Sequence, residues 1–349
     1  MISSKICEAF DITIEKAMEF NIPLLPVLPE NFGVLLIVGA SGSGKTSILK
    51  RDFGSYMKSY QWDTRVICEH FIDKDDAINR LGAVGLNSIP SWLKPYGILS
   101  NGEQFRADLA IRLSSNTAID EFTSVVDRNV AKSTCVSVRK YIDNNKLQNV
   151  VFSSCHFDII EWLQPDLVFN VDTKELIPRS LLRQRPKIKL DVLECSREYK
   201  STVWEVFKSH HYLSDTFNKS CRMFLCYWDG KLVGMSSSLA QPSGSLKNAF
   251  REHRTVILPD YQGMGFGVKL SNCCAQIHLD EGKRYFSRTT HFRLGEHREK
   301  SKLWRPTSKN KKLRTDIANR KGPLYNGYAG DSKRICYSHE YMGEISVNK

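Results

Sequence analysis

Two glycine-rich loops in this chain have the residue types and spacing to bind a diphosphate. The first is Gly39-Ala-Ser-Gly-Ser-Gly-Lys-Thr-Ser47, directly after the apolar segment 34–38. Its glycines let backbone N–H groups converge on phosphates, Lys45 can reach the terminal phosphates, and the Thr46 hydroxyl can bind Mg²⁺. This Walker A pattern, between an expected strand and an expected helix, predicts an ATP site. Its residues are Gly39, Gly42, Gly44, Lys45, Thr46 and Ser47.

Later segments indicate which class of ATPase this is. The stretch Leu99-Ser-Asn-Gly-Glu-Gln104 precedes an expected helix, and 116–121 (NTAIDE) then reads as a short strand ending in two carboxylates. Asp120 is expected to hold Mg²⁺ and Glu121 to polarise the attacking water. A further strand, 149–154, is followed by His156.

These motifs, in this order, resemble those of ABC-type ATPases over residues 1–178. The resemblance makes Ser100, Gly102 and Gln104 the signature motif, 124–127 the D-loop, and His156 the histidine that senses the γ-phosphate. In that family, the signature of one subunit closes over the ATP of another. One copy of each motif per chain therefore implies an ATP-dependent homodimer.

The chain also departs from the transporter members of that family. Only 55 residues separate Lys45 from Ser100, and Gln61 is the single early candidate for a Q-loop glutamine. Phe20 and Phe32 are candidates for an aromatic side chain that stacks on adenine, although each suits a core position as well. The departures favour a soluble member that works on nucleic acid or as a regulatory switch.

The second glycine loop is 259–270 (PDYQGMGFGVKL). Around it, the pattern predicts a strand, a helix, three strands, the loop, a helix and a fifth strand, with Asp229-Gly230 as a hairpin turn. This order, from residue 188 to 349 after a basic linker at 179–187, resembles the α+β GNAT acyltransferase fold. Its diphosphate loop is then the pattern Gln262-x-x-Gly265-x-Gly267. The resemblance implies that acetyl-CoA or a related acyl donor binds through Gln262, Gly263, Gly265 and Gly267.

Acyl transfer to an amine also needs a proton acceptor and contacts to the thioester carbonyl. The GNAT resemblance assigns the carbonyl contacts to backbone groups of 256–258, where the fourth and fifth strands diverge. His210, His211, Tyr212 and Asp215 form one group of candidate bases, and Tyr285 and His291 form another. A metal at His210, His211 and Asp215 has no recognised spacing.

A closer resemblance is to ABC-type ATPases fused to an acetyltransferase-like domain. Within the second half, 209–214 (SHHYLS) and the basic stretch after the fifth strand are similar to Mom-type proteins, GNAT-related enzymes that modify adenine in phage DNA. That similarity implies catalytic roles for His211 and Tyr212. The transferred group need not be acetyl.

Charge is distributed unevenly along the chain. The net charge is +12 overall, −4 over residues 1–178 and +16 over residues 179–349. The segment 283–321 holds 14 basic and three acidic residues, with Tyr285, Phe286, Phe292 and Trp304 among them. This pattern is typical of a surface that grips phosphates and stacks bases, although a solvated basic face would have the same charge.

The remaining features favour a cytoplasmic protein. No apolar run is long enough to span a membrane, and the first residues lack the pattern of a signal peptide. The ten cysteines contain no CxxC pair, which favours free thiols in a reducing compartment.

The sequence thus predicts an ATP-dependent acyltransferase acting on a nucleic-acid base, with DNA favoured over tRNA as the partner. Two alternatives stay open. The acceptor could be a tRNA or a protein lysine, or the ABC part could be an ATP switch joined to a GNAT-like module that binds without reacting.

Overall fold

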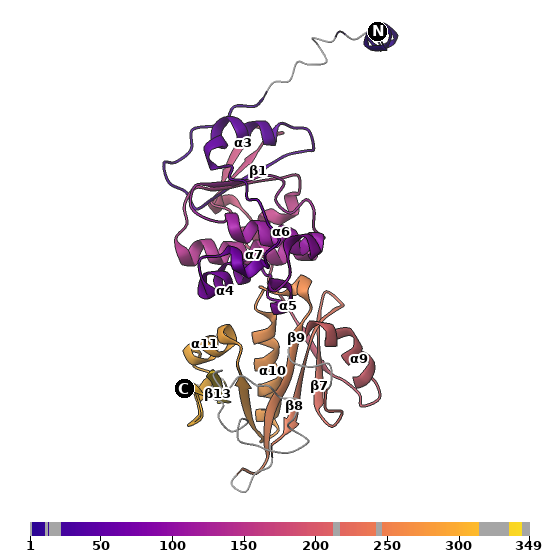
Figure 1. Ribbon diagram of the computed structural model, residues 1–349, viewed down its shortest axis with the longest axis vertical. Coiled ribbons are helices and arrows are strands. Elements are labelled where there is room, and N and C mark those ends of the chain that lie inside the picture. The colour runs from indigo at the N-terminus through magenta and orange to yellow at the C-terminus, as the bar shows by residue number, and fades with distance from the viewer. Residues whose placement is uncertain are drawn as a thin grey trace. The chain divides into compact units, whose positions relative to one another are not determined.

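The computed structural model describes residues 2–10, 13, 22–211, 217–241, 246–313 and 335–343. The chain forms two compact units, each a mixed α/β structure as the sequence predicts (Figure 1). The first unit comprises Met1–Leu86 and Ser91–Pro186, and the second comprises Asn87–Pro90 and Lys187–Lys349. Among the described residues, no helix combines the length and the apolar character needed to cross a membrane.

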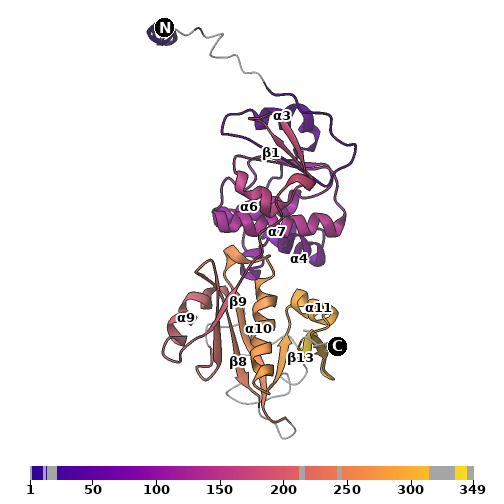
Figure 2. The same ribbon diagram turned by 180° about the vertical axis from the view of Figure 1, so that it is seen from behind.

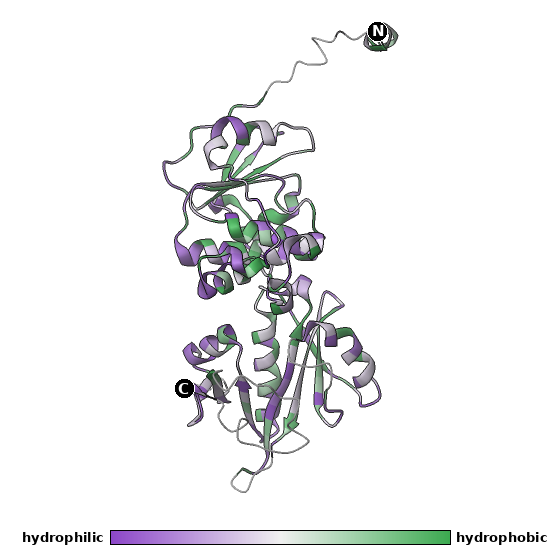
Figure 3. Ribbon diagram, in the orientation of Figure 1, coloured by the Kyte–Doolittle hydropathy of each residue, from purple (hydrophilic) through white to green (hydrophobic). Residues whose placement is uncertain are grey.

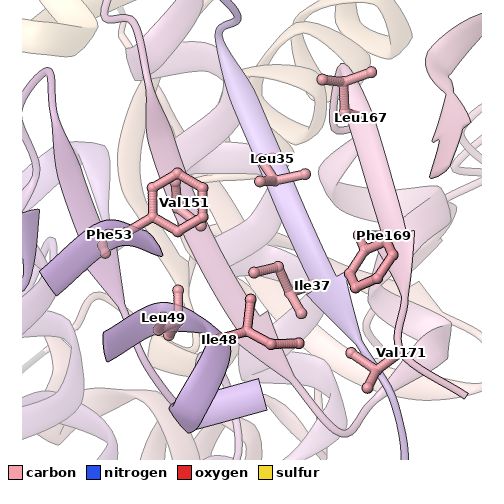
Figure 4. Packing of buried hydrophobic residues seen from close by; sticks show 10 residues of the cluster. Leu35, Ile37, Ile48, Leu49, Phe53, Val151, Leu167, Phe169 and Val171 are labelled. Atoms are coloured by element: carbon pink, nitrogen blue, oxygen red, sulfur yellow. The ribbon is translucent and has the colours of Figure 1, made fainter. Parts of the chain in front are cut away.

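The first unit is built on a five-stranded sheet in the order β2-β3-β1-β4-β5. All neighbouring strands are parallel except β4 and β5. The strands are β1 (Val34–Val38), β2 (Thr117–Ile119), β3 (Val150–Ser154), β4 (Leu167–Asn170) and β5 (Glu175–Pro178). Every residue of β1 and β3 is buried, as expected for central parallel strands covered on both faces. Figure 4 shows Leu35 and Ile37 of β1 packed beside Ile48 and Phe169.

The first unit contains the helices α1 (Ile2–Phe10), α3 (Lys45–Phe53), α4 (Lys74–Ala83), α6 (Asn101–Arg112), α7 (Arg128–Asn145) and α8 (Ile160–Leu163). The short helix α5 (Ile89–Trp92) begins in the stretch Asn87–Pro90, which belongs to the second unit. Short 3-10 helices occupy Gly54–Tyr56, Ile67–His70, Tyr96–Ile98, Phe157–Ile159 and Arg179–Leu181. Between α3 and α6, the helical insertion is small, as the spacing from Lys45 to Ser100 predicts.

The second unit contains a larger sheet in the order β11-β13-β10-β9-β8-β7-β6, with β12 paired to β13. Only β9 and β10 run parallel to each other among the described pairs. The strands are β6 (Asp191–Glu194), β7 (Arg222–Trp228), β8 (Lys231–Ala240), β9 (Ala249–Ile257), β10 (Arg284–Thr289), β11 (Trp304–Pro306), β12 (Lys312–Leu313) and β13 (Ile335–Tyr341). The predicted order of elements is confirmed from β6 to β10, and Asp229-Gly230 joins β7 to β8.

Helices cover both faces of this second sheet (Figures 1 and 2). They are α9 (Lys200–Phe207), α10 (Phe266–Asp280) and α11 (Phe292–Lys300), with 3-10 helices at Lys208–His210 and Pro259–Tyr261. Trp204 and Phe207 of α9 pack on Met235, whereas Ala275 of α10 packs on Tyr285.

The basic segment 283–321 contains folded structure in its described part, which extends to residue 313. It forms β10, α11, β11 and β12. Figure 3 shows α11 mainly in the hydrophilic colour, in contrast to the hydrophobic strands of the first sheet. Tyr285 and Trp304 are almost fully buried, so the expectation that these two rings stack on bases is wrong. Phe292 is 49% exposed, so its ring is accessible for stacking on a base.

The segment expected to be a linker, 179–187, lies against the first unit up to residue 186. Arg185 donates its Nε–H to the carbonyl of Trp162 at 3.0 Å, and Gln164 donates to the carbonyl of Arg183 at 2.8 Å. The first unit therefore extends through residue 186, five residues before β6 begins in the sequence.

Candidate functional site

The first glycine loop joins β1 to α3 with tightly constrained backbone geometry. Gly42 and Gly44 have positive φ angles of 80° and 95°, and Gly44 is the N-cap of α3. A Cβ at Gly39 would lie 2.7 Å from Ser43 Oγ and 3.1 Å from Val171 Cβ. The loop therefore needs glycine at all three positions, because the backbone either adopts a left-handed conformation or approaches its neighbours too closely.

Lys45 is buried beneath this loop. Its Nζ donates to the carbonyls of Gly39 at 2.9 Å and Ala40 at 2.6 Å, while Asp172 accepts the Ala40 N–H at 3.1 Å. The Ser43 hydroxyl is buried and has no partner among the described residues. A phosphate would give Lys45 a charged acceptor and Ser43 a partner, so the residues present fit a bound nucleotide.

Thr46 and Asp120 meet at the end of the loop, although 74 residues separate them in the sequence. The Thr46 hydroxyl donates to Asp120 Oδ2 at 2.7 Å, and Ser153 of β3 donates to Asp120 Oδ1. Hydroxyl and carboxylate oxygens are the ligands that Mg²⁺ prefers. The pair therefore fits the predicted magnesium site, and Ser153 orients its carboxylate.

Glu121 lies in a tight turn directly after β2. Its φ is 53° and that of Thr123 is 70°, a left-handed conformation that is unusual for a β-branched residue. The Glu121 N–H donates to Ser153 Oγ at 3.2 Å, and the Phe122 N–H donates to the Ser153 carbonyl at 2.7 Å. β3 thus holds the turn through the backbone and leaves the Glu121 side chain exposed.

His156 follows the carboxyl end of β3, the strand paired with β2, and Asp120 directly follows β2. Its N–H donates to Ser154 Oγ at 3.1 Å, and its Nδ1 is buried without a partner among the described residues. Burial, followed by the charge of Arg128, lowers the pKa of His156. The ring is therefore neutral near pH 7 and has one unused polar atom available for a ligand.

The predicted signature motif forms the start of α6. Ser100 caps this helix, and its hydroxyl and backbone N–H contact the Glu103 carboxylate at 3.0 Å each. Gly102 lies in the first turn, and Gln104 donates to the Tyr96 carbonyl at 3.1 Å. The Ser100 residue is exposed, whereas the Gln104 amide is used to fix the preceding turn.

Several residues that position these groups were missed by sequence reasoning. Trp62 stacks on Tyr96 with centroids 5.0 Å apart, and both donate to the Asp108 carboxylate on α6 at 2.6 Å. Their wide separation in the sequence hides this cluster. Its only signal is the density of aromatic residues before the signature.

The other residues that the sequence analysis singled out in the first unit make no described contact with the first glycine loop. Phe32 packs against the core of the first sheet, and Gln61 is exposed. Phe20 lies outside the described residues. Asp127, in the predicted D-loop, caps α7 by accepting the N–H groups of Asn129 at 2.7 Å and Val130 at 3.2 Å.

The second glycine loop joins β9 to α10 in a similar way. Gly263 and Gly265 have φ angles of 89° and 81°, and Gly265 is the N-cap of α10. The Gln262 side chain donates to the carbonyl of Ile257 at 2.9 Å, which ties the loop to the end of β9. A Cβ at Gly267 would lie 3.5 Å from the Ile257 side chain. The first N–H groups of α10 have no acceptor within the helix, so the loop suits an anion.

The sheet opens beside this loop. β9 and β10 pair only from Arg284↔Ala249 to Phe286↔Arg251, and beyond that point each strand pairs only with its other neighbour. Residues 256–258, at the end of β9 and just beyond it, lie past the last β9–β10 pair; the GNAT resemblance assigns them to the thioester carbonyl. Among them, the Leu258 N–H already donates to the Val233 carbonyl at 2.9 Å.

A β-bulge on β9 places a histidine that the sequence analysis did not single out. Ser237 pairs with Arg254 and Ser238 with Glu252, so His253 is the extra residue. Burial, then the positive charge of Arg254, lowers the pKa values of His211 and His253 to about 4. Tyr212 and Asp215 lie outside the described residues.

The other candidate bases have structural roles. Tyr285 is fully buried, and burial raises the pKa of its hydroxyl well above the usual value. His291 caps α11, its Nδ1 accepting the Leu294 N–H at 3.4 Å. Neither is placed to exchange protons with an amine. His210 is exposed, and no group of three or more potential metal-ligating side chains occurs in the described part of the chain.

Comparison with known proteins identifies the second unit. Residues 189–294 match the family described as Acetyltransferase (GNAT) family. They form a GNAT acetyltransferase domain. No curated protein matches the whole chain or a part of it.

Solved structures similar to the chain fall into two groups. An IAA acetyltransferase from Bacillus cereus has 12% identity and a TM-score of 0.31, covering 44% of this chain and 99% of its own. A Bacillus subtilis acetyltransferase in complex with CoA has 11% identity and a TM-score of 0.30, covering 44% and 98%. An ATP-binding cassette in a dimeric post-hydrolysis state with ADP and Pi has 14% identity and a TM-score of 0.33, covering 43% and 84%. At these identities and scores, nothing about substrates follows from the similarity.

Proposed function

We propose that the protein is an ATP-dependent acyltransferase that modifies a nucleic-acid base, and that it works as a homodimer. One observation carries the proposal. The chain joins a phosphate loop, whose Thr46 hydroxyl touches Asp120, to a GNAT domain whose glycine loop lies where β9 and β10 separate. Such a chain can bind a nucleoside triphosphate and an acyl thioester at once.

In the first unit, the loop amides and Lys45 hold the ATP phosphates, and Thr46 and Asp120 hold Mg²⁺. The metal supplies charge that neutralises the phosphate oxygens. Glu121 accepts a proton from the attacking water, and its backbone bonds to β3 fix its position. His156, neutral near pH 7 because of its lowered pKa, donates its ring N–H to an oxygen of the terminal phosphate. These roles are the ones that the resemblance to ABC-type ATPases implies.

The dimer follows from the sequence and from the exposed signature. Each chain holds one phosphate loop and one signature motif. Ser100 is exposed at the N-terminus of α6, where the backbone N–H groups and the helix dipole favour an anion. We infer that Ser100 and Gly102 of one subunit close over the ATP of the other.

In the second unit, the amides around Gly263 and Gly265 hold the diphosphate of the acyl donor. The acceptor amine nitrogen attacks the thioester carbonyl carbon, the carbon–sulfur bond breaks, and the thiol leaves with the proton that the amine gives up. His211 and His253, which their low pKa values keep unprotonated at pH 7, can carry that proton. Tyr212, next to His211, is the remaining candidate for this step.

Charge supports a nucleic acid as the acceptor. The chain from residue 179 onward has a net charge of +16, while residues 1–178 have a net charge of −4. The basic segment 283–321 and the resemblance of 209–214 to Mom-type proteins favour a DNA base. An exocyclic amine within a base pair is inaccessible, and ATP-driven closure of the dimer would expose it.

The test is mass spectrometry of nucleosides after incubation with ATP, acetyl-CoA and either duplex DNA, tRNA or bulk protein. A modified DNA nucleoside, absent with Lys45→Ala and with Gly265→Tyr, supports the proposal. Modification of tRNA or lysine alone refutes the DNA acceptor and moves the activity to that substrate. No product from any acceptor, although acetyl-CoA binds, would favour a non-catalytic binding module.

A further inference from the structure

A buried ion pair lies at the point where β9 and β10 separate. Glu252 of β9 and Arg298 of α11 have side chains that are 8% and 1% exposed, and Arg298 Nη2 donates to Glu252 Oε2 at 2.9 Å. The last backbone pair between the two strands is Phe286↔Arg251. The next residues along the strands are Ser287 and Glu252.

Side-chain bonds replace backbone pairing at this position. The Ser287 hydroxyl donates to Glu252 Oε2 at 2.6 Å, and Arg298 also donates to that hydroxyl. Ser271 of α10 donates to Glu252 Oε1 at 2.9 Å and accepts from Arg298 at 2.7 Å. Thr255 donates to Glu252 Oε1 at 2.8 Å. The network therefore ties β9, β10, α10 and α11 together around one carboxylate.

Glu252 stays ionised in this environment. Burial alone would raise the pKa of its carboxyl, but the Arg298 charge and the hydroxyl donors outweigh burial and hold the pKa below its usual value. Both carboxylate oxygens are occupied by donors, so Glu252 is not placed to take a proton from an amine. Its role must lie in the structure that the network imposes.

The Arg298 side chain is itself held in a fixed place. Its guanidinium lies 4.3 Å from the centre of the Trp304 ring, and the Trp304 N–H donates to Asn272 of α10 at 2.9 Å. The guanidinium is bonded to groups on β9, β10 and α10, so it cannot shift without leaving a buried charge unpaired.

We propose that the Glu252–Arg298 pair, with the Ser287 hydroxyl bonded to it, is a wedge that fixes the separation of β9 and β10 and so shapes the opening that receives the acyl donor. Arg298 is thus a positioning residue, acting through Ser287 and Glu252. The inference rests on the proposed acyl-donor site. It also links α11 to the proposed acyl-donor site, since α11 supplies Arg298.

The main test is the double variant Glu252→Gln/Arg298→Met, compared with each single change. Each single variant leaves one buried charge unpaired, so both should melt well below the wild type. The double variant removes both charges at similar volume and should recover much of that loss. The wedge predicts that it nevertheless binds acetyl-CoA at least about tenfold more weakly by calorimetry, at a temperature where it is fully folded. Wild-type affinity in the folded double variant would overturn the inference.

A second measurement needs no ligand. Amide hydrogen exchange at 252–257 and 287–289 should be faster in the double variant than in the wild type, while exchange at 222–228 stays unchanged. Exchange at 252–257 and 287–289 that is equal in the two proteins would overturn the wedge. Wild-type protein that binds no acetyl-CoA would instead refute the proposed function. The exchange measurement, which needs no ligand, would still test whether the ion pair fixes the separation of β9 and β10. Arg284→Gln is the matched control. Arg284 lies on β10, like Ser287, and forms an ion pair with Glu340 of β13 at 2.6 Å, but it stands where β10 is still paired with β9.

Should the double variant not fold, Ser287→Ala replaces it in both measurements. This change leaves both charges in place and removes only the hydroxyl that joins β10 to the pair. The wedge then predicts an affinity about fivefold weaker and faster exchange at 287–289. No change in either measurement would overturn the inference.

Discussion

Glu121→Gln separates catalysis from folding in the first unit. The side chain is exposed, and the turn is held by the Glu121 backbone N–H at 3.2 Å from Ser153 Oγ. Replacing one oxygen with an amide therefore leaves every described contact of the turn intact, and stability should change by less than about 0.5 kcal/mol. The amide cannot accept a proton. Loss of a general base costs about 10²–10⁴-fold in rate, which corresponds to about 3–5 kcal/mol in the barrier.

The assay is phosphate release at saturating ATP, with size-exclusion chromatography alongside. The variant should bind ATP, hydrolyse it at least about 100-fold more slowly and elute as a dimer with ATP and a monomer without it. Glu175→Gln is the control, because Glu175 is an exposed carboxylate on the edge strand β5. Hydrolysis close to the wild-type rate, or a monomer in the presence of ATP, would refute the role of Glu121 and the ATP-closed dimer.

Three further outcomes are expected. Lys45→Ala should abolish ATP binding in calorimetry without affecting acetyl-CoA binding. ATP affinity equal to that of the wild type would show that ATP does not bind at this loop. Gly265→Tyr should abolish acetyl-CoA binding and lower stability by about 1–2 kcal/mol, because the backbone there is left-handed. The control Gly282→Tyr, at a φ of 71° beyond α10, should lower stability by a similar amount and leave acetyl-CoA binding unchanged. Because the pKa values of His211 and His253 are lowered to about 4, the unfolded chain binds their protons first. Urea unfolding of the second unit should show stability falling as the pH drops below about 6.5 toward about 4, and a flat profile would contradict the burial of both rings.

Local patterns were sufficient to predict the loops and the elements around them. The strand at 34–38 and the element order from β6 to β10 depend on residues close together in the sequence. Glycine is required where a loop takes a positive φ, so Gly44 and Gly265 could be recognised without a structure.

Long-range contacts could not be predicted in the same way. Ser153 orients Asp120 from 33 residues away, and Arg298 reaches Glu252 across 46 residues. His253 becomes notable only because a bulge makes it the extra residue on β9. The aromatic pattern was misleading for Trp304, because its ring lies in the core while charged neighbours in the sequence lie outside. Such pairings depend on how strands and helices pack, which spacing does not encode.

The account requires that each chain bind two diphosphate ligands at separate loops. The most direct measurement is calorimetric titration of one protein sample with acetyl-CoA, first without and then with saturating ATP and Mg²⁺. We expect one acetyl-CoA and one ATP per chain, with neither displacing the other. Failure of acetyl-CoA to bind, or its displacement by ATP, would contradict the account.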